Sequence, residues 1–262
     1  MPDHLTGVVA IAADGRYNLA LTSDGSVEAW GVWGRGSVKS DVTAPRDLGS
    51  VTGVAAGSNH ALALLEDGTV AAWGENGAGQ CDVPSSLTGV VRIAGGGAHS
   101  LAVTQSGAVV AWGDSNWSQQ KISDRVDNAR LGDIFDIAAD GSLNLFLLDD
   151  GTVVAWDCHA DMWGDVIGGP DRGFYAPAEF SGPRVSAIAT GYANHLAVRD
   201  GYVLRAQSSR LTSPVPVPAD LGRAVDAAAG DGHSMALRAD GTVGAWGSNE
   251  YGQAVVPSEF AR

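Results

Sequence analysis

The segment Val51–Leu87, VTGVAAGSNHALALLEDGTVAAWGENGAGQCDVPSSL, contains one complete copy of a unit that recurs through the chain. The unit has a small-residue run (VAAG), an alternating apolar run (HALAL), an Asp-Gly turn, a second alternating run ending in Trp-Gly, a polar loop and a Pro-x-x-Leu segment. Aligning the turn glycines gives six copies, spaced 39 to 50 residues apart, at Gly25, Gly68, Gly107, Gly151, Gly201 and Gly241. A period of this length is typical of propellers and solenoids.

The turn Asp67-Gly68 lies between two alternating apolar runs, which predicts a β-hairpin. We expect a primed turn, because glycine takes the positive φ that such a turn requires. Side chains as small as those of Val54–Gly57 suit a strand that crowds against its equivalents around an axis. No segment has the periodicity of a long amphipathic helix. The sequence therefore predicts an all-β fold with four short antiparallel strands in each copy and the small-residue strand innermost.

The N-terminal segment Pro2–Val9 aligns with Pro84–Val91, so the chain starts at the end of a repeat and runs to the same point after Phe260. This predicts a β-propeller of six blades, with seven as the less favoured alternative. We expect one domain over residues 1–262, since the repeat is continuous. Ring closure should bring Val255–Val256 beside the first copy.

A tryptophan closes the third strand of five copies, where we expect it to pack between adjacent blades. The tryptophans in this position are Trp30, Trp73, Trp112, Trp156 and Trp246. Five copies also have a Pro-x-x-Leu or Pro-x-x-Phe segment. Because proline cannot donate to a strand ladder, it suits the end of an outer strand, and the Leu or Phe should anchor the connection to the next blade.

The patterns small-Ala-Gly, His-x-Leu-Ala, Asp-Gly-x-Val-x-Ala-Trp-Gly and Gly-Gln-x-x-Val-Pro all occur in the copy from Val51. Together they resemble the regulator-of-chromosome-condensation repeat family. In detail they are most similar to its bacterial branch, which includes the propeller-type β-lactamase inhibitor proteins. The resemblance implies a β-propeller. It leaves the function open, because this fold supports binding, nucleotide-exchange and enzymatic roles.

The chain is acidic, with 16 Lys and Arg against 30 Asp and Glu and a net charge of −14. Binding to nucleic acid or to an anionic membrane is therefore disfavoured, whereas basic or neutral protein partners are not. There is no leader pattern and no apolar run that could span a bilayer. With two scattered cysteines, Cys81 and Cys158, this indicates a cytoplasmic monomer, or a secreted protein if a leader was removed. We expect no cofactor.

Strand alternation divides the connections between two faces. The Asp-Gly hairpins and the Pro-x-x-Leu segments lie on one, here called the hairpin face. The connections after Ala-Gly and after Trp-Gly lie on the other, the loop face. These vary most, and the longest, residues 157–184, is the least repeat-like part of the chain. Variable insertions gathered on one face are typical of the binding face of a repeat protein.

Large aromatic residues in the loop-face connections are candidates for partner binding, because a few aromatic side chains often supply most of the affinity of an interface. Those that follow a Trp-Gly-type strand end are Trp33, Trp117, Trp163 and Tyr251, and those near Ala-Gly loops are Tyr17 and Tyr192. The alternative is that each caps the edge of its own blade, as scattered apolar surface residues commonly do.

Three histidines share one repeat position, His60, His99 and His233. A ring of histidines suggests a metal site, but the family resemblance implies a structural role, in which the side chain fixes a loop through a backbone hydrogen bond. We favour the structural role, since buried polar groups are normally hydrogen-bonded. The segment Asp157–Asp161 has the residue types of a metal site without a matching second half. We therefore expect no metal.

Our leading hypothesis is a binding propeller that engages a protein partner, as an inhibitor would, through the aromatic loop face. The alternative is a lyase, cyclase or isomerase that acts on a small molecule at the mouth of the propeller channel. Its candidate catalytic residues are His159, Asp161, Tyr192, Asp231 and His60. No linear catalytic motif supports an enzyme. Nucleotide exchange with chromatin binding, the third alternative, is disfavoured by the acidic charge. A deep channel mouth with convergent ionisable groups would favour the small-molecule reading.

Overall fold

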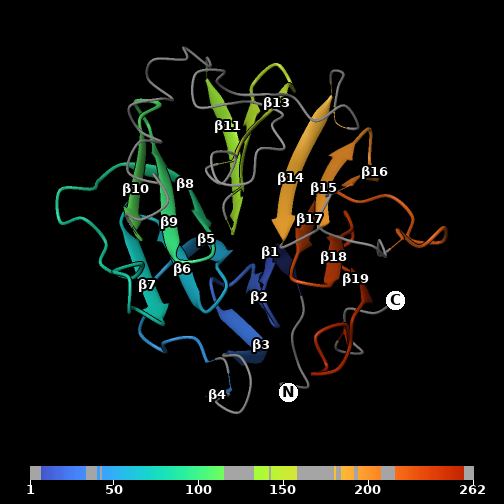
Figure 1. The fold of residues 1–262 in the computed structure, drawn as a ribbon, viewed down its shortest axis with the longest axis horizontal. Helices are drawn as coiled ribbons and strands as arrows, with labels where there is room; N and C mark the ends of the chain where they lie inside the picture. The colour runs from blue at the N-terminus through green and yellow to red at the C-terminus, as the bar shows by residue number, and fades with distance from the viewer. Residues whose placement is uncertain are drawn as a thin grey trace, which may run out of the picture.

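Six antiparallel sheets follow one another along the chain and stand around a common axis (Figure 1). The computed structural model describes residues 7–33, 40–41, 43–114, 133–141, 143–157, 180, 184–191, 194–207 and 216–256, with the backbone alone for 40–41, 156–157 and 206–207. Each sheet is built from one continuous segment, so each sequence repeat forms one blade. The six-bladed β-propeller predicted from the repeat count is confirmed.

Blade 1 contains β1 (Val8–Asp14), β2 (Tyr17–Thr22), β3 (Val27–Trp33) and β4 (Ser40–Asp41), and blade 2 contains β5 (Val51–Ala56), β6 (His60–Leu65) and β7 (Val70–Gly74). Blade 3 contains β8 (Val90–Gly95), β9 (His99–Thr104) and β10 (Val109–Gly113), and blade 4 contains β11 (Ile134–Asp140), β12 (Leu143–Leu148) and β13 (Val153–Asp157). Blade 5 contains β14 (Val185–Gly191), β15 (Asn194–Arg199) and β16 (Tyr202–Gln207), and blade 6 contains β17 (Asp226–Ala229), β18 (His233–Leu237) and β19 (Val243–Gly247).

Within the described residues a fourth strand is present in blade 1, and the described outer segments of blades 2 and 6 form no strand. The corresponding segment of blade 2 folds into turns instead. The Asp82 N–H donates to the Gly79 carbonyl at 3.0 Å and the Val83 N–H to the Cys81 carbonyl at 3.0 Å. These donors are used locally, and the following Pro84 has none, so no ladder to β7 forms.

The hairpins depend on the turn glycine, which has a φ of +77° at Gly68. The turn type differs from the predicted one. The Leu65 N–H donates to the Thr69 carbonyl at 2.9 Å across a three-residue connection, and Asp67 Oδ1 accepts the Thr69 N–H at 2.9 Å. In blade 5, Asp200 and Gly201 both have positive φ (53° and 81°), so that hairpin has the two-residue primed turn.

The tryptophan position fills the space between blades, as predicted. Trp30 packs with blade 6 residues Met235 and Val243, Trp112 with Leu62 and Leu64 of blade 2, and Trp246 with Leu196 of blade 5. Trp73 likewise contacts the blade 1 cluster that contains Tyr17 and Leu19. The side chain of Trp156 lies outside the description. The Leu or Phe after proline also packs into the inter-blade core, at Leu48, Leu87, Phe180 and Leu221.

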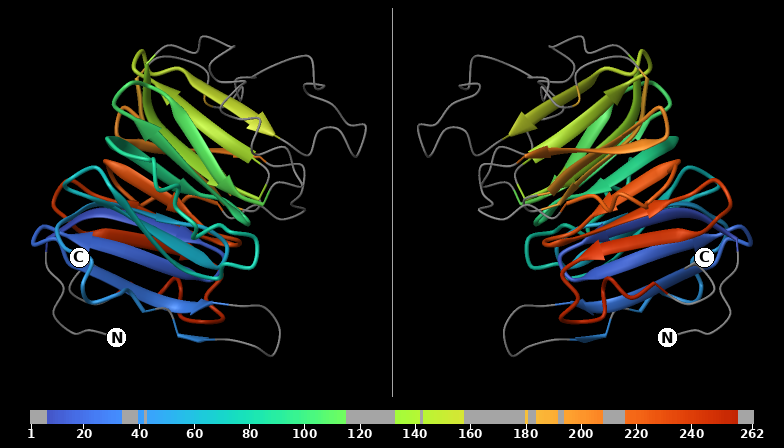
Figure 2. Two further views of the ribbon diagram at one scale, coloured as in Figure 1. Left: turned by 90° about the vertical axis from the view of Figure 1, so that its left-hand side faces the viewer. Right: turned by 90° about the vertical axis from the view of Figure 1, so that its right-hand side faces the viewer.

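The ring is closed by contacts between blades 6 and 1, which lie side by side in both views of Figure 2. Val8 and Ile11 of β1 share one core cluster with Met235, Leu237 and Val243, and the partly buried Val256 packs against it. The predicted return of Val255–Val256 to the first copy is therefore confirmed for Val256. In the described part of the chain, no helix is long and apolar enough to cross a membrane.

Candidate functional site

The strand registers define the two faces of the ring. Ala56 at the end of β5 pairs with Ala61, and His60 pairs with Gly74, so the inner and third strands of a blade end together on the loop face. On the hairpin face five of the six hairpins approach the next blade, at Gly25, Gly68, Gly151, Gly201 and Gly241. The Val90 N–H, at the start of β8, donates to the Gly68 carbonyl at 3.0 Å. The candidate residues can now be placed on one face or the other.

Tyr17 is fully buried, so its assignment to a partner-binding surface was wrong. Its hydroxyl donates to the His60 carbonyl of blade 2, and its ring meets Trp33 edge-on at a centroid distance of 5.8 Å. Trp33 is half-buried against the same inter-blade cluster. This pair therefore joins blades 1 and 2, and for Trp33 the structure favours the capping alternative over a projecting ring.

Tyr251 lies on the loop face, where the loop of blade 6 reaches blade 1. The Arg16 guanidinium is stacked over its ring, 4.9 Å from the centroid, and both side chains are partly exposed. The Tyr251 N–H donates to Oε1 of the buried Gln253 at 2.8 Å, which fixes the loop below the ring. Of the three aromatic candidates that the structure describes, Trp33 and Tyr251 are partly exposed, and Tyr251 carries the stacked Arg16. Trp117, Trp163 and Tyr192 lie outside the described residues.

The histidine position forms bonds between neighbouring blades. His60 Nε2 lies 3.0 Å from Ser100 Oγ of blade 3, and the Ser100 hydroxyl donates to the Gln80 carbonyl at 2.8 Å. Because that hydroxyl proton is used, His60 Nε2–H is the donor to Ser100. His99 Nε2 makes the corresponding contact with Asn144 Oδ1 of blade 4 at 3.1 Å. The hydrogen bond therefore goes to a side chain of the next blade, where we expected a backbone group.

Burial keeps these imidazoles neutral. It lowers the pKa of His60 to about 4, with a further contribution from His99, and that of His233 to about 4. His60 is fully buried within the ring of inter-blade bonds, so it does not belong to a catalytic centre at the channel mouth. Among the described residues no group of three or more His, Cys, Asp or Glu side chains is arranged to hold a metal ion.

Asp231, a further catalytic candidate, lies near two other carboxyl groups at the loop-face end of the inner strands. Asp14 and Asp140 occupy a repeat position that is glycine in the other four blades, and both are buried. Burial raises the pKa of Asp14 well above its usual range, and the neighbouring Asp140 and Asp231 carboxylates add to the rise. The candidates His159 and Asp161 lie outside the described residues.

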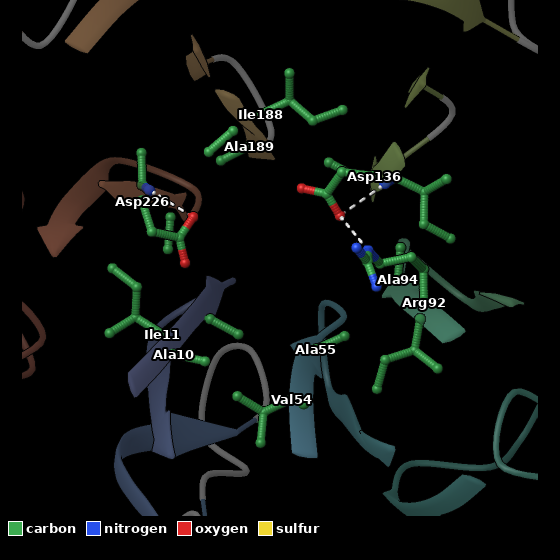
Figure 3. Close-up of a pocket in the computed structure, with 18 of the residues that line it drawn as sticks. Ala10, Ile11, Val54, Ala55, Arg92, Ala94, Asp136, Ile188, Ala189 and Asp226 are labelled. Carbon is green, nitrogen blue, oxygen red and sulfur yellow. Dashed lines mark hydrogen bonds and ion pairs between the residues drawn. The ribbon is translucent and has the colours of Figure 1, made fainter. Parts of the chain in front are cut away.

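The central channel contains a cavity of about 500 Å³, lined by all six inner strands (Figure 3). It opens toward the hairpin face, because exposure falls along each strand. Val9, near the start of β1, is 54% exposed, whereas Asp14 at the end of that strand is 1% exposed. At the narrow end the backbones approach closely, and a Cβ on Gly95 would lie 2.7 Å from the Gly57 nitrogen. The small-residue pattern thus closes one end of the channel and leaves the other open.

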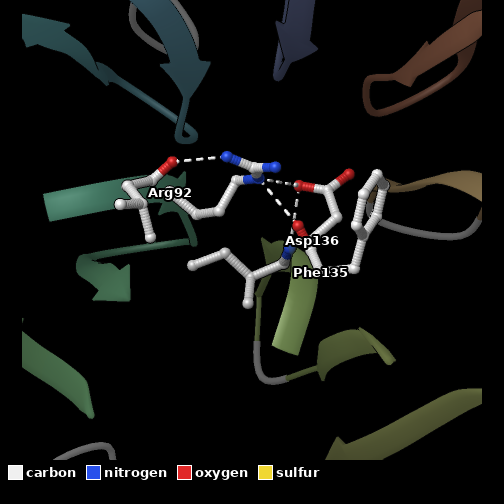
Figure 4. A network of polar contacts seen from close by, with 5 residues as sticks. Arg92, Phe135 and Asp136 are labelled. Carbon is white, nitrogen blue, oxygen red and sulfur yellow. Dashed lines mark hydrogen bonds and ion pairs between the residues drawn. The ribbon is translucent and has the colours of Figure 1, made fainter. Parts of the chain in front are cut away.

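Three charged residues, Arg92, Asp136 and Asp226, are among the lining residues of this cavity. Arg92 is held by two backbone acceptors, since its Nε donates to the Phe135 carbonyl and its Nη1 to the Val91 carbonyl, both at 2.7 Å. Its guanidinium also lies over the Phe135 ring and 3.9 Å from Asp136 Oδ1 (Figure 4). Arg92 therefore links blades 3 and 4 at the open mouth of the channel.

Both carboxyl groups at the mouth titrate above the usual range of aspartate. Burial raises the pKa of Asp136 to about 6, against the lowering effects of the Ile137 N–H and Arg92. Burial raises the pKa of Asp226 to about 7, and the Asp136 carboxylate adds to the rise. A cavity with convergent ionisable groups of perturbed pKa is the usual character of a ligand site.

None of these three residues was among the sequence candidates, which were sought on the loop face. A signal was present in the repeat alignment. Arg92, Asp136 and Asp226 share one inner-strand position, which is Ala10, Gly53 or Ala187 in the other blades. These strands line the axis of the propeller and are otherwise rich in small residues. A charged side chain in one of them is therefore expected to contact the solvent of the channel.

The fold and the repeat pattern together define a class, the six-bladed β-propellers built from sequence repeats. Residues 51–80, 90–119 and 224–253 each match the sequence profile of the Regulator of chromosome condensation (RCC1) repeat. These three segments therefore match the RCC1 repeat, as the sequence resemblance predicted. No curated protein matches the sequence. The resemblance to the bacterial inhibitor branch stays a prediction.

Solved structures with the same architecture span nearly the whole chain. Prp20p from Saccharomyces cerevisiae, whose structure was described with its binding properties to Gsp1p and histones, is 21% identical over 93% of this chain and 72% of its own (TM-score 0.60). Human WBSCR16 is 17% identical over 99% and 81% (TM-score 0.63). The CRINKLY WD40 ectodomain of the Arabidopsis thaliana receptor kinase ACR4 is 18% identical over 94% and 82% (TM-score 0.59). At these identities the likeness concerns the fold.

Proposed function

We propose that this chain is a binding propeller that engages a protein partner through its loop face. The observation that carries the proposal is the Arg16–Tyr251 stack, a partly exposed cation–π pair on that face. Tyrosine and arginine are enriched among the residues that dominate binding energy, and stacking pre-orders both side chains before a partner arrives. The RCC1-like fold supports the proposal, because Prp20p is described by its binding to proteins.

The chemistry of the partner follows from the charge of the chain. At −14 the propeller attracts a basic protein surface and repels an acidic one, and its charge does not oppose a neutral surface. Trp117 and Trp163, which follow the same strand ends in sequence, are proposed as further contacts of the loop face. Inhibition of a target enzyme is one form that such binding can take, and it agrees with the resemblance to the inhibitor branch.

A matched pair of variants tests the proposal. Tyr251→Ala removes the loop-face ring, whereas Tyr202→Ala removes a tyrosine that Arg223 covers at 5.6 Å beside the hairpin Asp200-Gly201, on the opposite face. Affinity capture from a lysate of the source organism should recover a protein with the parent chain and with Tyr202→Ala but lose it with Tyr251→Ala. Equal recovery with both variants would exclude this part of the loop face as the contact.

A further inference from the structure

We propose that the open end of the central channel is a binding site for a small alkylammonium cation. The ammonium group would lie against Asp226 and Asp136, and its alkyl chain against the apolar rim of the channel. This site lies on the hairpin-face side of the ring and is independent of the loop-face contact proposed above. It is a small-molecule site, and no reaction is assigned to it.

The first support is the shape of the cavity. Its volume of about 500 Å³ is within the range of small-molecule pockets. The rim is formed by Val9, Phe135 and Val225, each about half exposed. Below it, side chains such as Ile11 and Ile188 turn away from the channel into the inter-blade core (Figure 3). The narrow end is closed by tightly packed glycine and alanine backbones. A ligand therefore enters from the hairpin face and is surrounded by all six blades.

The second support is the balance of charge at the mouth. Arg92, Asp136 and Asp226 are the charged residues among the described lining, so their sum is −1 when all are ionised. Arg92 lies beside Asp136 and offsets it. Asp226 lies across the channel, with its carboxyl directed into the cavity, and its Oδ1 accepts the neighbouring Ala227 N–H at 2.8 Å (Figure 3). The uncompensated charge of the site is thus the Asp226 carboxylate.

A cation suits this arrangement better than an anion or a neutral molecule. An ammonium ion between the two carboxylates is attracted by both and relieves the repulsion between them, an effect that grows where water is partly excluded. A carboxylate ligand would meet two like charges for one guanidinium whose Nε and Nη1 already donate to backbone carbonyls. The exposed apolar side chains of the rim, Val9, Phe135 and Val225, then favour an alkyl chain over a hydrated inorganic ion.

Calorimetric titration of the full chain with pentylamine tests the site, with hexanoate and 1-pentanol as probes of matched shape. At about pH 8 we expect pentylamine to bind with one-to-one stoichiometry, and the anion and the alcohol to bind at least roughly tenfold more weakly. Lowering the pH to about 5.5 should weaken pentylamine binding by roughly tenfold or more. The amine stays charged over this range, whereas the two carboxyl groups take up protons. Besides each other, the only charged residue of the described lining that they face is Arg92.

Variants locate the binding. Asp226→Asn should weaken pentylamine at least roughly tenfold, and Asp136→Asn gives a second test should the first variant fail to fold. Glu66→Gln makes the same charge change on an exposed residue beside the hairpin of blade 2 and should leave the affinity unchanged. Equal binding of hexanoate, no loss with either aspartate variant, or an equal loss with Glu66→Gln would each overturn the proposal.

Discussion

His233 Nε2 lies 2.8 Å from Asn18 Oδ1, although the two residues are 215 positions apart. Asn18 Nδ2 in turn donates to the Gln253 carbonyl at 3.0 Å, so one amide binds both the second strand and the loop of blade 6. His60 reaches Ser100 and the Gln80 carbonyl in the same way between blades 2 and 3. Blades 6 and 1 are therefore joined by the same kind of hydrogen-bonded link as blades 2 and 3.

Asn18→Ala should destabilise the whole propeller, because it leaves both the His233 N–H and the Gln253 carbonyl without partners in a buried place. The expected loss in the free energy of unfolding is about 2–4 kcal/mol, measured by chemical denaturation. Since closure couples all blades, far-UV circular dichroism and tryptophan fluorescence should still change together in one transition. A separate early transition confined to one probe would show that blades 6 and 1 open without unfolding the rest.

The glycine three residues before each of these histidines is required by the imidazole itself. A Cβ on Gly96 would lie 2.1 Å from Cε1 of His99, and the nearest atoms are all in that ring. Gly96→Ala should therefore cost about 1–3 kcal/mol, whereas Gly77→Ala, which has open space around it, should cost much less. Adding His99→Asn to Gly96→Ala should cost less than the sum of the single changes. Strict additivity in this double-mutant cycle would contradict the steric explanation.

Two equally buried tryptophans differ in their hydrogen bonding. Trp112 Nε1 donates to the Gln80 carbonyl at 2.9 Å, whereas Trp246 Nε1 has no hydrogen-bond partner among the residues that the structure describes. The two side chains are 7% and 8% exposed, so the loss of ring volume should cost a similar amount in each. Trp112→Phe should then lower the free energy of unfolding by about 1 kcal/mol more than Trp246→Phe does. Equal losses would mean that the indole hydrogen bond contributes nothing measurable.

The fold was predictable because its determinants are local and repeated. Asp67-Gly68 indicates a hairpin turn and Trp73 indicates packing between blades. The six copies of the pattern predict the number of blades. The placement of aromatic residues was less predictable. Tyr17 aligns with His60, and that alignment indicated burial, since a side chain in this position bonds to the next blade. The Tyr17 side chain was mistaken for a surface residue because it is close to a variable loop in the sequence and its register within the strand was not considered.

The channel site was missed for a different reason. Arg92, Asp136 and Asp226 come from three separate blades and are brought together by ring closure alone. No linear motif records such a juxtaposition, although each charge stands out in a small-residue strand. The end at which the channel is open follows from the exposure along the inner strands. That exposure depends on how closely the glycines of neighbouring blades approach each other. That quantity is a property of the assembled ring.

The channel carboxyls also predict how stability changes with pH. Because the pKa of Asp226 is raised to about 7 in the folded chain, its contribution to stability is complete below its unfolded pKa and is lost as pH rises through about 7. Asp226→Asn should therefore gain stability relative to the parent between about pH 5 and pH 8. The neutral histidines change the stability with pH in the opposite direction. With a folded pKa of about 4, His60 and His233 contribute above their unfolded pKa and lose that contribution as pH falls toward 4.

Because the histidine effect is common to both proteins, it cancels in the difference between Asp226→Asn and the parent, measured by urea unfolding across this pH range. Asp67→Asn provides a control of opposite sign. Its carboxylate accepts hydrogen bonds from Thr69, which lower the pKa of Asp67 in the folded chain, so this variant should lose stability at neutral pH and recover it in acid. If the Asp226→Asn difference stays constant with pH while the Asp67→Asn difference changes as expected, the Asp226 carboxyl is well solvated. The pKa of Asp226 in the folded chain would then not be raised.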